Sequence, residues 1–325
     1  MDKISLIVPC YNESSPLWET YFEIRRVFES KKVAEKYIYE MIFVNDGSSD
    51  DTLDIIKDIT IIDNHVKFIS FTRNFGKEAG MLAGLEYATG DAAVILDADL
   101  QHPPYLILEM LHYYEKGYDQ VIAKRSRKGE KFTRKWVTKF YYKIVNKLVD
   151  VELNDGIGDF RLLSKKVVDS LLTLPEYNRF SKGLFSWVGY NKKIIEYENQ
   201  DRVSGESKWS FASLLNYAID GVTSFNSRPL RLIIYLGLFI TSMSLLYIGF
   251  TFVNILLTGI DMPGYFTLIS SILLLSGIQL ISIGILGEYL GRIFYEVKRR
   301  PKFIIHDTNI EPACNNKTTT EISHS

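Results

Sequence analysis

Cysteine is scarce in this chain: among 325 residues only Cys10 and Cys314 are cysteines, and they stand far apart. Their spacing matches no metal-binding or redox motif, so we expect neither a metal centre nor a dithiol site from them. A reducing compartment is the simple expectation. The formal net charge is also small, at −1. The length permits about one to three domains.

Charged residues are absent from two long stretches, residues 232–260 and 262–287. Each stretch exceeds the ~20 residues that a helix needs to cross a bilayer. Buried core helices are the alternative, but two such stretches in succession are unusual in a globular domain. We therefore predict a transmembrane hairpin over residues 231–297, with its two helices at about 232–258 and 265–290.

The charges around this hairpin predict its orientation. Arg228 and Arg231 precede the first span, basic residues at 298–300 follow the second, and the connector carries only Asp261. Because cytoplasmic loops are enriched in Lys and Arg, both termini should face the cytoplasm of a plasma (inner) membrane. The polar start, MDKIS, does not resemble a signal peptide.

Up to about residue 125, short apolar runs alternate with amphipathic stretches. Helical patterning fills the gaps, for example over residues 76–89 and 105–116. This rhythm indicates βαβ units and an α/β fold, with a mostly parallel sheet covered by helices on both faces. The runs that we expect to be strands are residues 4–10, 39–45, 66–71, 92–96 and 120–123.

Polar motifs follow three of these runs. The first run ends in PCYNE, the second in NDGSSDDT, and the fourth in Asp97-Ala98-Asp99. Strand residues i and i+2 point to the same side, so the carboxylates of Asp97 and Asp99 can share a divalent cation with phosphate oxygens of a ligand. Taken singly, Asp-x-Asp can be a solvated turn and NDGSSD a helix N-cap. Three such loops at one sheet edge, where open α/β sheets bind ligands, indicate a site.

Residues 124–147 are strongly basic, with Glu130 as their single acidic residue. Four of the lysines recur every fourth residue beside an apolar stripe, which is typical of an amphipathic helix lying in a membrane interface. A solvated face or a nucleic-acid patch is the alternative. The nearby hairpin favours the membrane, and we expect no nucleic-acid partner. The basic residues are Lys124, Arg125, Arg127, Lys128, Lys131, Arg134, Lys135, Lys139, Lys143 and Lys147.

The predicted organisation has four parts. A first domain spans residues 1–205 and contains the basic amphipathic helix at 133–150. A juxtamembrane amphipathic helix follows at 206–230, although its apolar residues would also suit an ordinary core. After the hairpin, residues 298–325 form a cytoplasmic, largely disordered tail.

Five motifs precede the hairpin in a fixed order: PCYNE, NDGSSDDT, DADLQHP, GDFRLLS and RVSGESKWS. With them the chain resembles the polyprenyl-phosphate glycosyltransferases, the dolichol-phosphate-mannose-synthase-like branch of family 2 glycosyltransferases. In particular it resembles the bacterial bactoprenol glucosyltransferases with two C-terminal transmembrane helices. The resemblance covers about residues 3–300. It implies a GT-A (Rossmann-like) domain and an inverting transfer of a hexose from a nucleotide sugar to polyprenyl phosphate at the cytoplasmic leaflet, for cell-envelope glycosylation.

On the donor side, the resemblance implies three groups of residues. Mg²⁺ or Mn²⁺ on the donor diphosphate would be held by Asp99, Gln101 and Asp97. A mobile loop would cover the donor phosphates with Arg202, Ser207 and Lys208. The nucleoside would be bound by Pro9, Tyr11, Glu13 and Asp46, with Asp97 against the nucleotide.

On the acceptor side, the resemblance implies that Arg125 and Arg134 clamp the lipid phosphate and that Asp159 lines the reaction centre. A phosphate monoester has a second pKa of about 6, so it is mostly dianionic and needs positioning more than a general base. The arginine fork suits that task because it binds phosphate bidentately. Asp159 would then orient a basic side chain or a sugar hydroxyl, or serve structurally as an N-cap or as a partner of Arg161. Asp99, Asp159 and Arg134 are the candidate catalytic residues.

Several alternatives stay open. Relatives with two spans more often use UDP-sugars, so UDP-glucose or UDP-GlcNAc is favoured over GDP-mannose. A processive polysaccharide synthase shares the Asp-x-Asp domain, but the chain lacks a Gln-x-x-Arg-Trp motif and further spans. The intact acidic and basic motifs argue against a non-catalytic nucleotide-sugar-binding membrane protein. Small residues in both spans permit close helix packing, and we expect a homo-oligomer.

Overall fold

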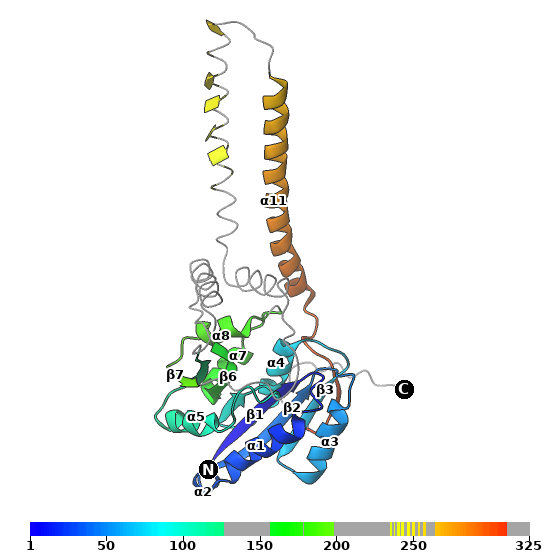
Figure 1. The fold of residues 1–325 in the computed structure, drawn as a ribbon, viewed down its shortest axis with the longest axis vertical. Helices are drawn as coiled ribbons and strands as arrows, with labels where there is room; N and C mark the ends of the chain where they lie inside the picture. Colours follow the sequence, from blue (N-terminus) through cyan, green and yellow to red (C-terminus); the bar gives the residue numbers. More distant parts are fainter. Residues whose placement is uncertain are drawn as a thin grey trace.

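The computed structural model describes residues 1–126, 157–177, 179–197 and 264–310, with single positions of a helical stretch between 235 and 257. The helices predicted at 133–150 and 206–230 and most of the first predicted span lie outside these residues. An α/β domain and a long helix that extends away from it make up the described part (Figure 1).

One eight-stranded sheet organises the α/β domain, in the order β7-β5-β6-β4-β1-β2-β3-β8. Strands β1 to β4 pair in parallel with one another, as does β5 with β7. Strand β6 is antiparallel to β4 and β5, and β8 is antiparallel to β3. The strands are β1 (Asp2–Cys10), β2 (Tyr37–Asn45), β3 (Val66–Phe71), β4 (Ala92–Ile95), β5 (Gln120–Arg125), β6 (Ile157–Ser164), β7 (Lys192–Tyr197) and β8 (Ile305–Thr308).

The five apolar runs of the sequence correspond to β1 through β5, with ends that differ by a few residues at most. Their near-continuous burial follows from helices on both faces of the sheet, which leave no solvent-facing side for polar alternation. The sheet is mostly parallel, as the sequence predicts, and it is mixed because β6 and β8 run in the opposite direction to the other six strands.

Helices cover the sheet on both faces (Figure 1). Apolar residues of α1, α3 and α5 pack with β1 and β2 in one buried cluster, whereas α4, α7 and α8 contribute to a second cluster on the other face. The contact between α4 and β1 is close, since a Cβ at Gly84 would lie 2.2 Å from Cγ2 of Ile7. The helices are α1 (Leu17–Glu29), α2 (Lys31–Ala34), α3 (Thr52–Ile62), α4 (Lys77–Tyr87), α5 (Leu106–Glu115), α7 (Lys165–Leu172) and α8 (Ser181–Trp187).

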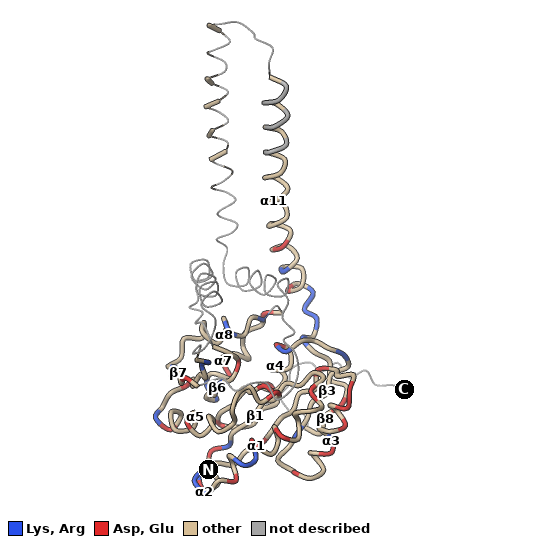
Figure 2. The backbone as a smooth tube through the Cα atoms, in the orientation of Figure 1, with Lys and Arg blue, Asp and Glu red and all other residues tan. Residues whose placement is uncertain are grey.

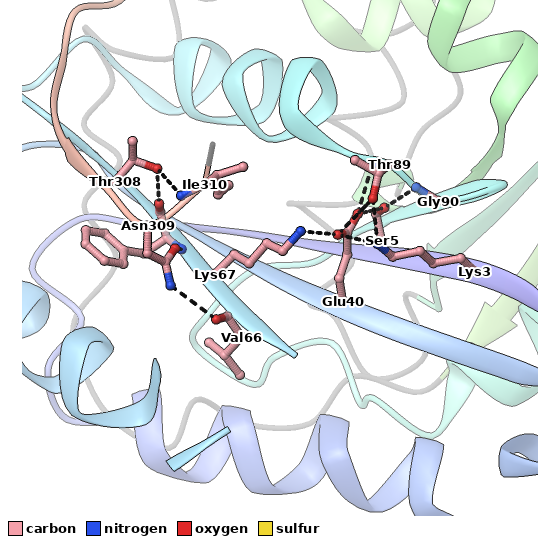
Figure 3. A network of polar contacts seen from close by, with 11 residues as sticks. Lys3, Ser5, Glu40, Val66, Lys67, Thr89, Gly90, Thr308, Asn309 and Ile310 are labelled. Carbon is pink, nitrogen blue, oxygen red and sulfur yellow. Dashed lines mark hydrogen bonds and ion pairs between the residues drawn. The ribbon is translucent and has the colours of Figure 1, made fainter. Parts of the chain in front are cut away.

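A buried carboxylate ties the first three strands together. Glu40 of β2 is 2% exposed and forms ion pairs with Lys3 of β1 at 2.8 Å and with Lys67 of β3 at 2.9 Å (Figure 3). It also accepts hydrogen bonds from the Ser5 hydroxyl and the Thr89 backbone. Burial acts to raise the pKa of Glu40, but the bonds from Lys3, Ser5 and Thr89 outweigh it and lower the pKa to about 2.

The long helix, α11 (Tyr265–Lys298), has 34 residues and begins where the second span is predicted to begin. Many of its apolar side chains are exposed, among them Leu268, Leu280 and Leu290. Its charged residues, from Glu288 onward, are confined to the end beside the α/β domain, as Figure 2 shows. Over the residues that the structure describes, no helix is both long enough and apolar enough to span a membrane.

After α11 the chain returns to the sheet. Ile305–Thr308 forms β8 on the outer edge of β3, and the side chain of Asn309 accepts a hydrogen bond from the backbone of Phe68 at 2.7 Å. Ile310 is buried against β2 and β3. The prediction of a largely disordered tail after residue 298 is therefore wrong for residues 301–310. This segment is polar and therefore shows no strand pattern, although it contains a short strand whose partner, β3, lies far away in the sequence.

Candidate functional site

The predicted site residues converge because of how the strands run. The carboxyl ends of β1, β2, β4 and β5 share one edge of the sheet, as the register of the parallel pairs requires. Strand β6 is antiparallel, so Asp159, near its start, comes to the same edge. Pro9, Asp46 and Arg125 lie in or directly after the other strands at that edge, in agreement with the position of ligand sites in α/β sheets.

The loops after β1 and β2 are joined by hydrogen bonds from backbone N–H groups of one loop to side chains of the other. The backbone N–H of Asn12 donates to the Ser48 hydroxyl at 3.0 Å, and the N–H of Ser49 donates to the Asn12 side chain at 2.9 Å. Gly47 has φ +64°, and a Cβ there would lie 2.4 Å from the backbone of Arg73. A glycine is therefore required at this turn. The motifs PCYNE and NDGSSDDT thus lie against each other and form one wall of the candidate site.

Asp46 fastens this wall to the start of α4. Its carboxylate accepts hydrogen bonds from the backbone N–H of Phe75 at 2.6 Å and of Gly76 at 2.9 Å. Burial raises the pKa of Asp46 and outweighs the lowering by these two bonds. The residue is 3% exposed, so its first task is to shape the loop between β3 and α4. Tyr11, by contrast, is 41% exposed and open to a ligand.

Asp97 and Asp99 both follow the end of β4 at Ile95, so strand alternation does not set their directions as the sequence argument assumes. A turn holds them instead. The buried Thr20 of α1 donates to the Ala98 carbonyl at 2.7 Å, and the Gln101 N–H donates to the Asp99 carboxylate at 3.1 Å. Leu100 between them has φ 56°, a left-handed conformation that is uncommon for such a side chain. Backbone strain of this kind is concentrated at functional sites.

Lys77 joins the acidic residues of two neighbouring strands, β4 and β6. As the first residue of α4, it places Nζ 2.6 Å from Oδ1 of Asp97 and 2.6 Å from Oδ2 of Asp159. Burial would raise the pKa of both carboxyl groups, but the ammonium of Lys77 outweighs it and lowers them. The sequence reasoning missed Lys77. The signal was available, since it follows a glycine one short loop after β3, at the same sheet edge.

His102 supports Asp97 from the other side. Its Nε2 lies 3.5 Å from the Asp97 carboxylate and its Nδ1 lies 2.6 Å from the hydroxyl of Tyr197, at the end of β7. Burial raises the pKa of Tyr197 to about 12, so the phenol keeps its proton and can donate to Nδ1. Tyr197 is a second residue that the sequence reasoning missed.

The oxygen ligands beside this turn suit a hard divalent cation. Asp97 and Asp99 offer carboxylate oxygens and Gln101 offers an amide oxygen. The buried side-chain amide nitrogen of Gln101 is a donor and makes no hydrogen bond to the described residues. Within the same part of the chain, no three His, Cys, Asp or Glu side chains form a cluster that could hold a metal. A site with few protein ligands fits Mg²⁺, which binds one or two carboxylates together with substrate phosphates and water.

The remaining predicted residues are distributed as follows. Arg125 is exposed at the end of β5 and pairs in register with Tyr197 of β7. Arg161, considered from the sequence as a possible partner of Asp159, donates to the backbone carbonyls of Gly158 at 2.6 Å and Asp159 at 3.4 Å within β6. Four predicted site residues lie outside the described residues: Arg134, Arg202, Ser207 and Lys208.

With this geometry in place, comparison with known proteins is decisive. Residues 5–172 match the glycosyl transferase family 2 profile. The chain belongs to glycosyltransferase family 2. Residues 228–293 match a second profile, the GtrB C-terminal hairpin. The family 2 assignment confirms the resemblance predicted from the motifs, and the mixed sheet is of the GT-A type.

Relatives of this family 2 enzyme match it over nearly its whole length. CsbB of Bacillus subtilis (strain 168), whose glycosyltransferase activity is inferred, is 55% identical over 94% of this chain and 92% of its own. The SfII prophage-derived bactoprenol glucosyl transferase of Shigella flexneri is 44% identical over 93% of this chain and 97% of its own. A prophage bactoprenol glucosyl transferase homolog of Escherichia coli (strain K12) is 41% identical over 93% and 98%. The chain is therefore a glycosyltransferase.

Proposed function

We propose that this glycosyltransferase moves a hexose, with inversion, from a nucleotide sugar to a polyprenyl phosphate at the cytoplasmic face of a membrane. The observation that carries the proposal is the 44% identity to a bactoprenol glucosyl transferase across 93% of the chain. The acidic edge of the sheet supports it, because Asp97, Asp99 and Asp159 lie together where a GT-A fold binds its donor. UDP-glucose is the favoured donor, with UDP-GlcNAc next.

On the donor side, Asp97, Asp99 and Gln101 would hold Mg²⁺ or Mn²⁺. A bound divalent cation would stabilise the negative charge that develops on the nucleoside diphosphate as the sugar bond breaks. The wall formed by PCYNE and NDGSSDDT is the proposed nucleoside site, with the exposed Tyr11 available to contact it. Arg202, Ser207 and Lys208 are proposed to cover the donor phosphates.

On the acceptor side, the reaction needs no strong base. The lipid phosphate is mostly dianionic near neutral pH and attacks the anomeric carbon directly. Asp159 is already paired with Lys77 at 2.6 Å, and that pairing keeps it ionised and fixes its direction. We therefore assign Asp159 an orienting role. Arg125 and Arg134 are proposed to bind the acceptor phosphate.

The membrane anchor is proposed to be a hairpin of two transmembrane helices. Three observations favour this hairpin: the uncharged stretches at 232–260 and 262–287, the match of residues 228–293 to the hairpin profile, and the exposed apolar side chains of α11. The charged end of α11 contacts the α/β domain, where the backbone of Tyr177 donates to Glu296 at 2.7 Å. This contact would hold the sheet domain close to the cytoplasmic surface.

The deciding experiment incubates the purified full-length protein with a short-chain polyprenyl phosphate and a panel of labelled donors. UDP-glucose, UDP-GlcNAc and GDP-mannose are tested with Mg²⁺ and with Mn²⁺. We expect a single sugar on the lipid, from UDP-glucose in preference to the others. A preference for GDP-mannose would change the donor assignment. A growing polymer would indicate a processive synthase, and nucleotide-sugar binding without transfer would indicate a binding protein.

Arg134 should serve the acceptor specifically. A charge-assisted contact to phosphate in a partly desolvated site is worth about 1.5–3 kcal/mol, whereas a lysine near anionic lipid contributes about 1 kcal/mol, screened by salt. Arg134→Ala should therefore slow transfer about tenfold or more and leave donor affinity nearly unchanged. Lys139→Ala is the matched control and should have a small, salt-dependent effect. If the two variants lost the same share of the transfer rate, Arg134 would be assigned to membrane-surface binding and not to the acceptor phosphate.

Topology can be tested by cysteine labelling in intact cells. In a background with Cys314 replaced by serine, Asp261→Cys should react with a membrane-impermeant thiol reagent added from outside. Arg300→Cys should react only after the cells are opened, because basic residues flanking the spans stay in the cytoplasm. Arg300 is exposed in the structure, so poor accessibility would not explain a lack of labelling. The reverse pattern would contradict the proposed orientation.

A further inference from the structure

The proposed function uses the contact of Lys77 with Asp159 but gives no task to the contact of Lys77 with Asp97. Its ammonium bridges Asp97, after β4, and Asp159, in β6, and it comes from a third element, α4. Without a cation between them, two carboxylates at one sheet edge would repel each other. Lys77 therefore keeps the acidic site assembled when no donor is bound.

The same contact competes with the proposed metal. An ammonium group has only donors and cannot join a coordination shell, so the Asp97 oxygen that holds Lys77 is not free for a cation. The pair is nevertheless accessible, because 28% of the Asp97 side chain and 43% of the Lys77 side chain are exposed. The lysine stem is flexible, and the ammonium can swing while Asp159 retains it. His102 would keep Asp97 in position during such an exchange.

We propose that Lys77 is the resident counter-ion of the donor site: it neutralises Asp97 until a metal-bound nucleotide arrives, then releases Asp97, stays on Asp159 and faces the donor diphosphate. The inference rests on the proposed function for the nature of the donor. It makes two binding predictions of opposite sign. Lys77 weakens binding of the bare metal, because both cations use Asp97, and strengthens binding of the bare nucleotide diphosphate, because it supplies positive charge.

The test measures binding to the purified full-length protein with no lipid acceptor present. Free Mn²⁺ is followed by electron paramagnetic resonance, and UDP binding without metal by calorimetry. An opposite charge shifts a carboxylate equilibrium by about 1–3 pKa units, so Lys77→Met should bind Mn²⁺ about tenfold more tightly than wild type. UDP should bind to this variant severalfold more weakly. Lys166→Met is the matched control, since Lys166 is an exposed lysine 3.8 Å from Asp119, and it should change neither affinity.

A second variant guards against a folding defect in Lys77→Met. Lys77→Arg keeps the charge and can hold a carboxylate by two parallel bonds, so its Mn²⁺ affinity should equal or fall below that of wild type. Unchanged or weaker Mn²⁺ binding in folded Lys77→Met, or tighter Mn²⁺ binding in Lys77→Arg, would overturn the inference. Failure of the proposed function would be seen separately, as absence of transfer by wild type to polyprenyl phosphate, with the binding results unaffected.

Discussion

Replacing Asp99 by asparagine should reduce sugar transfer about a hundredfold while the protein stays folded. The Asp99 side chain lies in the turn after β4, where it accepts one bond from the Gln101 backbone at 3.1 Å. An asparagine can retain that bond through its amide oxygen, so the turn should persist. The substitution removes the negative charge that would attract a divalent cation, and with it the stabilisation of the leaving diphosphate.

The measurement is turnover across a Mn²⁺ titration, together with the melting temperature. Asp169→Asn is the matched control, because Asp169 is an exposed carboxylate that lies 3.9 Å from Lys165 on α7. It should leave both turnover and melting temperature unchanged. If Asp99→Asn retained near-normal turnover, and if EDTA did not affect wild type, the assignment of a metal to this turn would be wrong.

Removing the Glu40 carboxylate should produce the largest loss of stability. Glu40→Ala leaves Lys3 and Lys67 without their buried partner, and the hydroxyl of Ser5 loses its acceptor. Breaking a buried ion pair on one side costs about 3–5 kcal/mol. In a domain of this size such a loss lowers the melting temperature by about 10 °C. Glu40 lies in the middle of β2, away from the carboxyl edge, so the folded fraction should keep its activity.

The effect of pH on this network has a definite sign. The folded-state pKa of Glu40, about 2, lies below its ordinary value of 4.5. The contribution of ionised Glu40 to the free energy of unfolding is therefore complete above pH 4.5. It is lost as the pH falls from 4.5 towards 2, by roughly 3 kcal/mol in total. The stability difference between wild type and Glu40→Gln should shrink over that range. Glu29→Gln, at an exposed pair with Arg25, should shift stability by less than about 0.5 kcal/mol at any pH. If the stability difference between wild type and Glu40→Gln stayed constant from pH 6 to pH 2, the assignment of a lowered pKa to Glu40 would be wrong.

The strands that the sequence predicts correctly are those with a strong local signal. The run at residues 92–96 is apolar throughout because both faces of the sheet are covered, and β4 occupies Ala92–Ile95 of it. Strand β6 contains the whole of GDFRLLS, a motif recognised for its chemistry and not as a strand. Strand β8 is four residues long and only Ile305 among them is apolar, so its pairing with β3 is what identifies it. Short strands of this kind depend on distant partners and leave little local pattern.

The residues of the candidate site likewise differ in how much local sequence signal they carry. Asp97, Asp99 and Gln101 could be found from one continuous motif that follows an apolar run. Lys77 and Tyr197 are harder to find, because their roles depend on contacts with residues 20 and 95 positions away in the sequence. For Lys77, the preceding glycine and the position one short loop after β3 are the available signal. Asp46 shows the limit of motif reasoning in another way, since its carboxylate binds the backbone of Phe75 and Gly76 in the structure. A motif identifies a residue as important without saying what it contacts.

The position of β8 has a consequence for biosynthesis. Thr308 bonds to Phe68, which lies 240 residues earlier in the chain. A ribosome working at about 5–20 residues per second needs roughly ten to fifty seconds to cover that distance. During this interval the nascent sheet exposes the outer edge of β3, and an unpaired strand edge is a template for wrong pairing. Translation must pass through α11 before the edge can be covered. The sheet of this enzyme is thus completed only after α11 has left the ribosome.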